Sequence, residues 1–165
     1  MPPFHESIRE YKKQLEKGEI QKAYRGLMGY IMDLRTHFKN TCPDYFVSGL
    51  YQGYMDMSYF SFSPRPFKQR NLKIAIVFLH ETFRFEVWLA GYNKQVQAEY
   101  WKLFHESGWK NYRVVPTTKG ADSIVEHVLA DNPDFSNPDA LTQQLERECL
   151  VFIRDVESFL TAQEN

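Results

Sequence analysis

Two stretches of the chain carry aromatic and charged side chains at every second position. Tyr54 and Asp56 stand two residues apart in the first stretch, and Arg84, Glu86 and Trp88 do so in the second. Because successive side chains of a strand point to opposite faces, residues two apart share a face. We therefore expect one sheet face to gather these five side chains. Aromatic surface with a few charged groups is typical of a small-ligand site.

The same alternation predicts which residues face the other way. With Tyr54 and Asp56 turned outward, Met55, Met57 and Tyr59 are expected in the core. A plainer interpretation of the outward residues is an ion pair between the arginine and one of the two acids on a solvated face. Such a cross-strand pair would contribute only about 0.2 to 1 kcal/mol.

A second group of candidate residues lies in the segment RPFKQRNLK, which has four basic residues and no acid. They are Arg65, Lys68, Arg70 and Lys73, with Phe67 interleaved. Basic side chains beside an aromatic ring can hold a phosphate and stack a base. The segment thus predicts a phosphate or nucleic-acid contact, and the alternative is an ordinary solvated loop.

The sequence lacks the familiar motifs for metals, cofactors and covalent catalysis. The segment TTKG has neither the upstream Gly nor the following Ser or Thr of a P-loop, and no dinucleotide fingerprint occurs. Ser48 precedes Gly49 without the first Gly of a nucleophile elbow. We therefore predict no metal site and no cofactor. No two histidines have the spacing of ligands on one helix face; they are His5, His37, His80, His105 and His127.

Length and composition indicate a single folded domain over residues 1–165. Hydrophobic residues make up 43% of the chain and aromatic residues 16%, which excludes disorder. A formal net charge of -1 attracts neither polyanions nor membrane surfaces, so no nucleic-acid partner is expected. No apolar run approaches the roughly 20 residues of a membrane span, and the start lacks the apolar core of a signal peptide. With Cys42 and Cys149 as reduced thiols, we expect a cytoplasmic protein.

The elements that must position these residues begin with two helices. Phe4, Ile8, Tyr11 and Leu15 form one helical stripe, and Gly18 ends it. A longer stripe predicts a second helix over 19–39. We expect the two helices to form an antiparallel hairpin over about 4–39.

The middle of the chain predicts a sheet with one helix, over about 46–116. Strands are expected over 50–62, 72–80 and 83–91, with the second covered on both faces. Asn93 is expected to cap the following helix, and a short strand over 112–115 comes next. The last part, about 121–162, predicts a short helix over 124–129 and a long one after Asn137 and Pro138. The order ααβββαβαα indicates a single α+β domain with a mostly antiparallel sheet.

Three segments carry a resemblance to a known family. They are YMDMSYFSF, LKIAIVFLHETFRFEVWLAGYNKQVQAEYWKLF and KGADSIVEHVL, and the likeness extends back to EYKKQLEKGEIQKAYRGLMGYIMDLRTHFKN. Over nearly its whole length the chain resembles an uncharacterised bacterial domain of unknown function. The resemblance implies a small bacterial cytoplasmic protein and transfers no functional residue.

The order of elements in the middle is also similar to the core of the PD-(D/E)XK nucleases. Members of that fold need two acids and a lysine to hold a divalent metal and to activate water. The chain has Glu86-Val87-Trp88 where the acid-x-lysine sequence would stand, and Asp56 lies one strand too early. On the next helix Gln95, Gln97 and Tyr100 are similar to accessory positions of some members.

Three functional hypotheses follow from the sequence. The first is a non-catalytic module that binds a small molecule or a protein through the aromatic and charged sheet face. The second is a metal-dependent or degenerate nuclease with Asp56 and Glu86 as ligands and Lys73 or Lys94 as the lysine. The third is self-association into a homo-oligomer through two exposed tryptophans, Trp101 and Trp109.

Overall fold

A computed structural model describes residues 1–164 of the chain. Within that range the chain forms five helices and six strands, which confirms the predicted α+β class. Their bounds in chain order are α1 Phe4–Lys17, α2 Glu19–Thr41, β1 Phe46–Val47, β2 Met57–Ser63, α3 Arg65–Gln69, β3 Leu72–Leu79, β4 Arg84–Gly91, α4 Lys94–Ser107, β5 Arg113–Val114, β6 Val125–Asp131 and α5 Pro138–Glu164.

The strands form one antiparallel sheet in the order β1-β2-β3-β4-β6-β5. Its centre is β3, which pairs with β2 on one side and with β4 on the other. In this register Val77 pairs with Tyr59 and with Glu86, so these three side chains share a face. The neighbouring row joins Ile76 to Phe60 and to Val87 on the opposite face.

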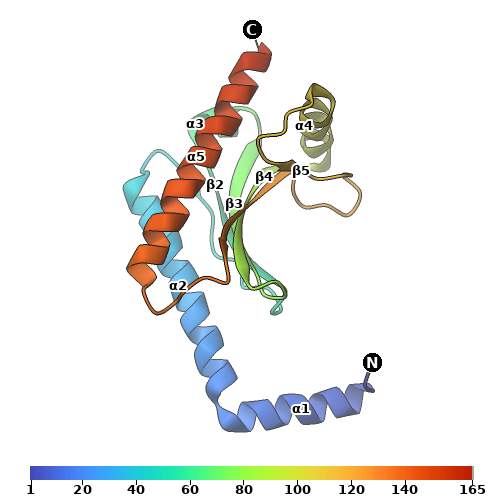
Figure 1. The fold of residues 1–165 in the computed structure, drawn as a ribbon, viewed down its shortest axis with the longest axis vertical. Coiled ribbons are helices and arrows are strands. Elements are labelled where there is room, and N and C mark those ends of the chain that lie inside the picture. The colour runs from blue at the N-terminus through green and yellow to red at the C-terminus, as the bar shows by residue number, and fades with distance from the viewer. Residues whose placement is uncertain (165) are drawn as a thin grey trace.

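Helices α2 and α5 cover only one face of the sheet (Figure 1). That face presents phenylalanine and aliphatic side chains, and it packs against the buried stripes of both helices. Tyr30 on α2 joins the two helices through a hydroxyl hydrogen bond of 3.0 Å to Thr142 on α5. The opposite face has only a small cluster of its own, in which Ala75, Val77 and Trp88 are buried. Met57, Tyr59 and Leu79, which belong to the sheet itself, pack against this cluster. The apolar residues that β3 places on this face are therefore covered by other side chains of the sheet and not by a second helical layer.

The predicted N-terminal helices are present, but they do not lie side by side. Gly18 separates them and has the left-handed φ of 79° that its position requires. An antiparallel helical hairpin needs a loop of about two to five residues. With a single residue between them, α1 extends away from α2 as an arm (Figure 1), and none of its residues is buried.

The predicted helix over 124–129 is wrong, because this segment forms β6. Its apolar pattern, Ile124, Val125, Val128 and Leu129, fits one turn of a helix as well as a short strand. Pairing decides the outcome. Strand β4 would otherwise present an open edge, and the β-branched Val125 pairs with Leu89 across it.

Both predicted helix caps are confirmed. The Asn93 side chain accepts a hydrogen bond of 2.9 Å from the backbone N–H of Val96, at the start of α4. The Asn137 side chain accepts one of 3.2 Å from Ala140, directly before α5. None of the helices described is both long and apolar enough to pass through a bilayer.

Candidate ligand-binding pocket

The predicted pairing of Tyr54 and Asp56 with the later strand is wrong. Both residues precede β2, in a turn where Gly53 and Met55 have positive φ values of 74° and 64°. These backbone angles break the alternation on which the prediction depended, because a strand needs negative φ throughout. Asp56 accepts a hydrogen bond of 2.8 Å from the backbone N–H of Tyr54. Hydrogen bonds from backbone N–H groups, those of Tyr54 and Met57 first, lower the pKa of the Asp56 carboxyl. The carboxylate thus accepts hydrogen bonds from its own turn, as Asp side chains commonly do.

The strand itself has the opposite face assignment to the one predicted. Phe60 is fully buried against the helices, whereas Met57 and Tyr59 pack on the other face beside Trp88. The bulky phenylalanines of β2 are buried on the helix-covered face. Because side chains alternate along a strand, Met57 and Tyr59 must then lie on the uncovered face.

Arg84, Glu86 and Trp88 share one face of β4, as predicted, and hydrogen bonds join their side chains. Glu86 accepts from Arg84 Nε at 2.7 Å and from Trp88 Nε1 at 2.9 Å. Both carboxylate oxygens of this buried residue are thus occupied by neighbours. The indole uses its only donor in this bond, so the Trp88 ring is held in place and offers its π surface rather than a polar group.

The basic segment does not form one site. Lys68 lies on α3 with Nζ 3.8 Å from the ring centroid of Phe46, and Arg70 pairs with Glu164 at 2.7 Å. Arg65 lines a separate small hollow together with Lys68. Only Lys73 extends onto the uncovered sheet face. These four side chains therefore have three different environments and present no common surface to a phosphate chain.

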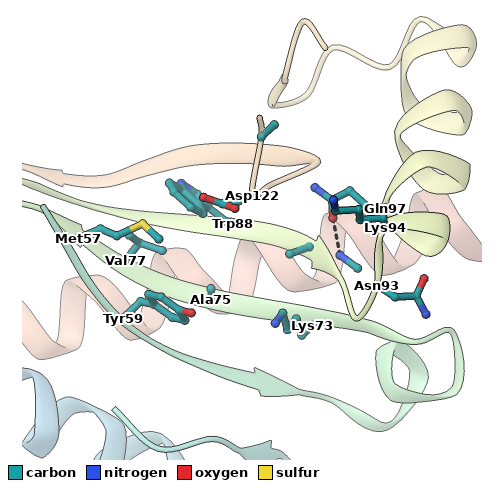
Figure 2. A pocket seen from close by; sticks show the side chains of 13 residues that line it. Met57, Tyr59, Lys73, Ala75, Val77, Trp88, Asn93, Lys94, Gln97 and Asp122 are labelled. Carbon is teal, nitrogen blue, oxygen red and sulfur yellow. Dashed lines mark hydrogen bonds between the residues drawn. The ribbon is translucent and has the colours of Figure 1, made fainter. Parts of the chain in front are cut away.

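A pocket of about 300 Å³ lies on the uncovered face, between the sheet and the start of α4. Its floor is apolar and comes from β3 and β4, including Ala75, Val77 and Trp88. Figure 2 shows Tyr59 on the neighbouring strand, and Gln97 and Lys94 at the α4 end. We call this the sheet-face pocket. It is lined by Met57, Tyr59, Lys73, Ala75, Val77, Trp88, Ala90, Gly91, Asn93, Lys94, Gln97, Ala121 and Asp122.

Gln97 is the most informative polar residue of the sheet-face pocket. Its Oε1 accepts a hydrogen bond of 2.7 Å from the backbone N–H of Gly91, which fixes the orientation of the amide (Figure 2). Its Nε2 is buried and has no acceptor among the residues described. Leaving a buried donor unpaired costs about 1 to 3 kcal/mol. An amide in this position needs an acceptor atom from outside the protein, either a ligand or a water.

The charges around the sheet-face pocket favour an anion at the α4 end. Lys73 and Lys94 both line the pocket, and within residues 1–164 neither forms a salt bridge. The N-terminus of the fourteen-residue α4 adds its positive dipole end at the same place. Asp122 is the single acid in the lining, and it lies toward Trp88 in Figure 2. The pocket thus has a basic end and an acidic end over an apolar floor.

The structure does not bring the proposed nuclease ligands together. Both oxygens of Glu86 are engaged by Arg84 and Trp88, while Asp56 belongs to the turn before β2. Over the described part of the chain, no group of three His, Cys, Asp or Glu side chains could hold a metal ion. No observation of the fold therefore favours the nuclease hypothesis.

Of the five residues predicted for the sheet face, only Trp88 lines the sheet-face pocket. Among the residues predicted for the basic contact, Lys73 does so. Sequence reasoning named Gln97 only as similar to an accessory nuclease position and did not place it on the aromatic sheet face. The available signal was the Asn93 cap directly after a strand, which places the first turn of α4 at the end of the sheet.

Gly91, the last residue of β4, sets the distance between the sheet and α4. A Cβ added there would lie 2.7 Å from the backbone nitrogen of Gln97 and 3.2 Å from the carbonyl oxygen of Asn93. Backbone atoms cannot rotate away, so Gly91→Ala should displace the start of α4 and lower the free energy of unfolding by about 1 to 3 kcal/mol. Chemical denaturation would measure the loss. Gly49→Ala is the control because its Cβ meets no atom within 4 Å, and equal losses in the two variants would contradict the prediction.

Comparison with family models gives a match over nearly the whole chain. The model described as Domain of unknown function (DUF7000) matches residues 4–160, which confirms the resemblance seen in the sequence. No curated protein matches the chain, and no solved structure matches it. A bacterial origin and a nuclease-like core stay predictions.

Proposed function

The chain belongs to this domain family, whose description assigns no activity, and from the geometry of the sheet-face pocket we propose that it binds a small organic anion. The ligand combines a flat apolar group with a carboxylate or phosphate. The flat group lies on the floor beside Trp88, and the anionic oxygens lie at the α4 end. This is a binding role without catalysis, in the cytoplasmic setting that the sequence predicts.

The observation that carries the proposal is the buried Gln97 amide without an acceptor. Gln97 as a residue is only 9% exposed, and its side-chain oxygen already accepts a hydrogen bond from Gly91. Its Nε2 can therefore only donate, and an anionic oxygen is the strongest acceptor it can meet. Lys73 and Lys94 on the same pocket lining supply the matching charge.

The apolar part of the ligand follows from the floor. Ala75 and Val77 of β3 have small side chains, and the hydrogen bond to Glu86 holds the Trp88 ring in place. A ring placed there would gain apolar contact and offset stacking of about 0.5 to 1.5 kcal/mol with the indole. At about 300 Å³ the pocket is at the small end of the usual range for ligand sites, so a single ring with one anionic group is the appropriate size.

A set of three benzene derivatives tests the ligand class. Benzoate carries the anion, benzyl alcohol is neutral and benzylamine is cationic, while the ring stays the same. Titrations followed by two-dimensional NMR should show benzoate shifting both the Trp88 indole N–H and the Gln97 side-chain amide signals. Benzyl alcohol should bind more weakly, and benzylamine should leave the Gln97 amide signal unchanged. If benzoate moves neither signal, the proposed function is wrong.

Gln97→Glu should weaken benzoate binding by at least about tenfold. The new carboxylate still accepts from Gly91 but replaces the Nε2 donor with a negative oxygen, and a hydrogen bond to a charged group contributes about 1.5 to 3 kcal/mol. Gln95→Glu is the control, since it makes the same charge change on the same helix at an exposed position outside the pocket lining. Equal benzoate affinities in the two variants would contradict the role of Gln97.

A further inference from the structure

Helix α1 presents an apolar stripe that is largely uncovered within residues 1–164. Phe4, Ile8 and Tyr11 are exposed, and Leu15 is half-buried. The spacing of four, three and four residues puts all of them on one side of the helix. An isolated helix of this length is marginal in water, because tertiary packing supplies most helical stability. A helix of fourteen residues with no buried side chain therefore needs a partner.

The partner surface cannot come from α2 of the same chain. Gly18 is the only residue between the two helices, so the stripe cannot fold back onto α2 without unwinding a turn. The arm instead leaves two hollows open along the N-terminal half of α2. One, of about 690 Å³, lies in the angle between α1 and α2. The other, of about 680 Å³, lies between α2 and Phe135.

The two hollows adjoin, because Ile20, Tyr24 and Met55 line both of them. Their lining is largely apolar, and it includes the exposed side chains of Ile20, Met55 and Phe83. Charged residues occur only singly and with both signs, as Glu10, Glu19, Lys22 and Arg25. A surface of this kind fits an apolar helix and does not select a charged ligand.

We propose that the occupant is α1 of a second copy of this chain, in a reciprocal dimer. One stripe and one set of hollows lie on each copy, so a two-fold axis can satisfy both at once. Six large apolar side chains are exposed in these two parts, namely Phe4, Ile8, Tyr11, Ile20, Met55 and Phe83. At roughly 100 Å² each they would bury about 600 Å² per copy, and about 1,200 Å² in total is the lower bound of a standard stable interface.

The tryptophans expected to drive self-association are engaged within the chain. Trp101 donates a hydrogen bond of 2.7 Å to the carbonyl of Val115 and stacks on His105. The second ring, at position 109, packs against Phe104 and Phe159. Neither is an exposed large apolar side chain. The dimer proposed here therefore uses the other end of the molecule.

The test is the mass of the full chain in solution, measured by light scattering after size-exclusion chromatography over a range of concentrations. The wild type should have twice the mass of one chain at micromolar concentrations. The double variant Ile8→Glu, Tyr11→Glu should have the mass of one chain, and so should Ile20→Glu on α2. All three positions are exposed, so far-UV circular dichroism should show that most of the helix and sheet content of the chain is retained.

Lys13→Glu serves as the control because it lies on the side of α1 opposite the stripe and changes the charge by two. It should remain dimeric. Hydrogen exchange adds a second measurement, since α1 amides should be protected in the wild type and at least about tenfold less protected in the double variant. A wild type with the mass of one chain at every concentration, or a double variant that keeps twice that mass, would overturn the proposal.

Discussion

Replacing Phe78 with alanine should lower the free energy of unfolding by about 3 to 5 kcal/mol, the largest effect expected from any single truncation in this core. Phe78 lies on the central strand and is fully buried. Its ring has edge-to-face contacts with Phe83, Phe85 and Phe135, at centroid distances of 5.2, 4.9 and 6.3 Å. Alanine would remove these contacts and leave a cavity between β3, β4 and the segment before α5.

Urea denaturation would measure this loss. Tyr54→Ala is the control, because Tyr54 is 89% exposed and loss of its side chain should change the free energy of unfolding by less than about 0.5 kcal/mol. A loss below about 1 kcal/mol in Phe78→Ala would mean that the sheet does not pack against α2 and α5 as described.

Replacing Glu86 with alanine should have the second largest effect, a loss of about 2 to 3 kcal/mol. Glu86 is 4% exposed and accepts both the Arg84 and the Trp88 hydrogen bonds. Its removal leaves the buried indole N–H without an acceptor. The Arg84 side chain is 35% exposed and can return to water, so we assign most of the loss to Trp88 and little to the ion pair.

Two further variants separate these contributions. Arg84→Ala should cost clearly less than Glu86→Ala, because it leaves the bond from Trp88 to Glu86 intact. Trp88→Phe in the Glu86→Ala background should recover part of the lost stability by removing the unpaired N–H. If Arg84→Ala were the more damaging change, the ion pair rather than the indole bond would stabilise this face. Glu86→Ala should also weaken benzoate binding, since the pocket floor would lose its fixed ring.

Local sequence signals account for the helix ends and for most of the elements. Gly18, Asn93 and Asn137 mark helix ends through conformational freedom or side-chain capping, which are properties of a few adjacent residues. Alternation along 84–90 likewise predicted the two faces of β4, because β4 pairs with β3 without a break from Arg84 to Gly91. The α+β class follows from such local patterns, and the structure confirms it.

Tertiary pairing decided what these patterns left open. The segment 124–129 becomes a strand because β4 has a free edge, and no property of that segment alone distinguishes the two outcomes. The positive φ at Gly53 and Met55 keeps Asp56 in a turn before β2. The faces of β2 itself are set by the burial of Phe60 and Phe62 against the helices. Exchanging the two faces of a strand moves every one of its side chains, so Met57 and Tyr59, and not Tyr54 and Asp56, share a face with Trp88.

The sheet-face pocket also exists only in three dimensions. It joins Trp88 of β4, Tyr59 of β2 and Gln97 of α4, residues that share no local motif. A sequence pattern cannot show that the Nε2 of Gln97 is buried without an acceptor. The burial and the hydrogen bonding of this atom depend on all the residues packed around it. Local residue preferences therefore specify the helices and most strands. Long-range packing specifies which side chains come into contact, because contacts between distant segments depend on register, burial and shape together.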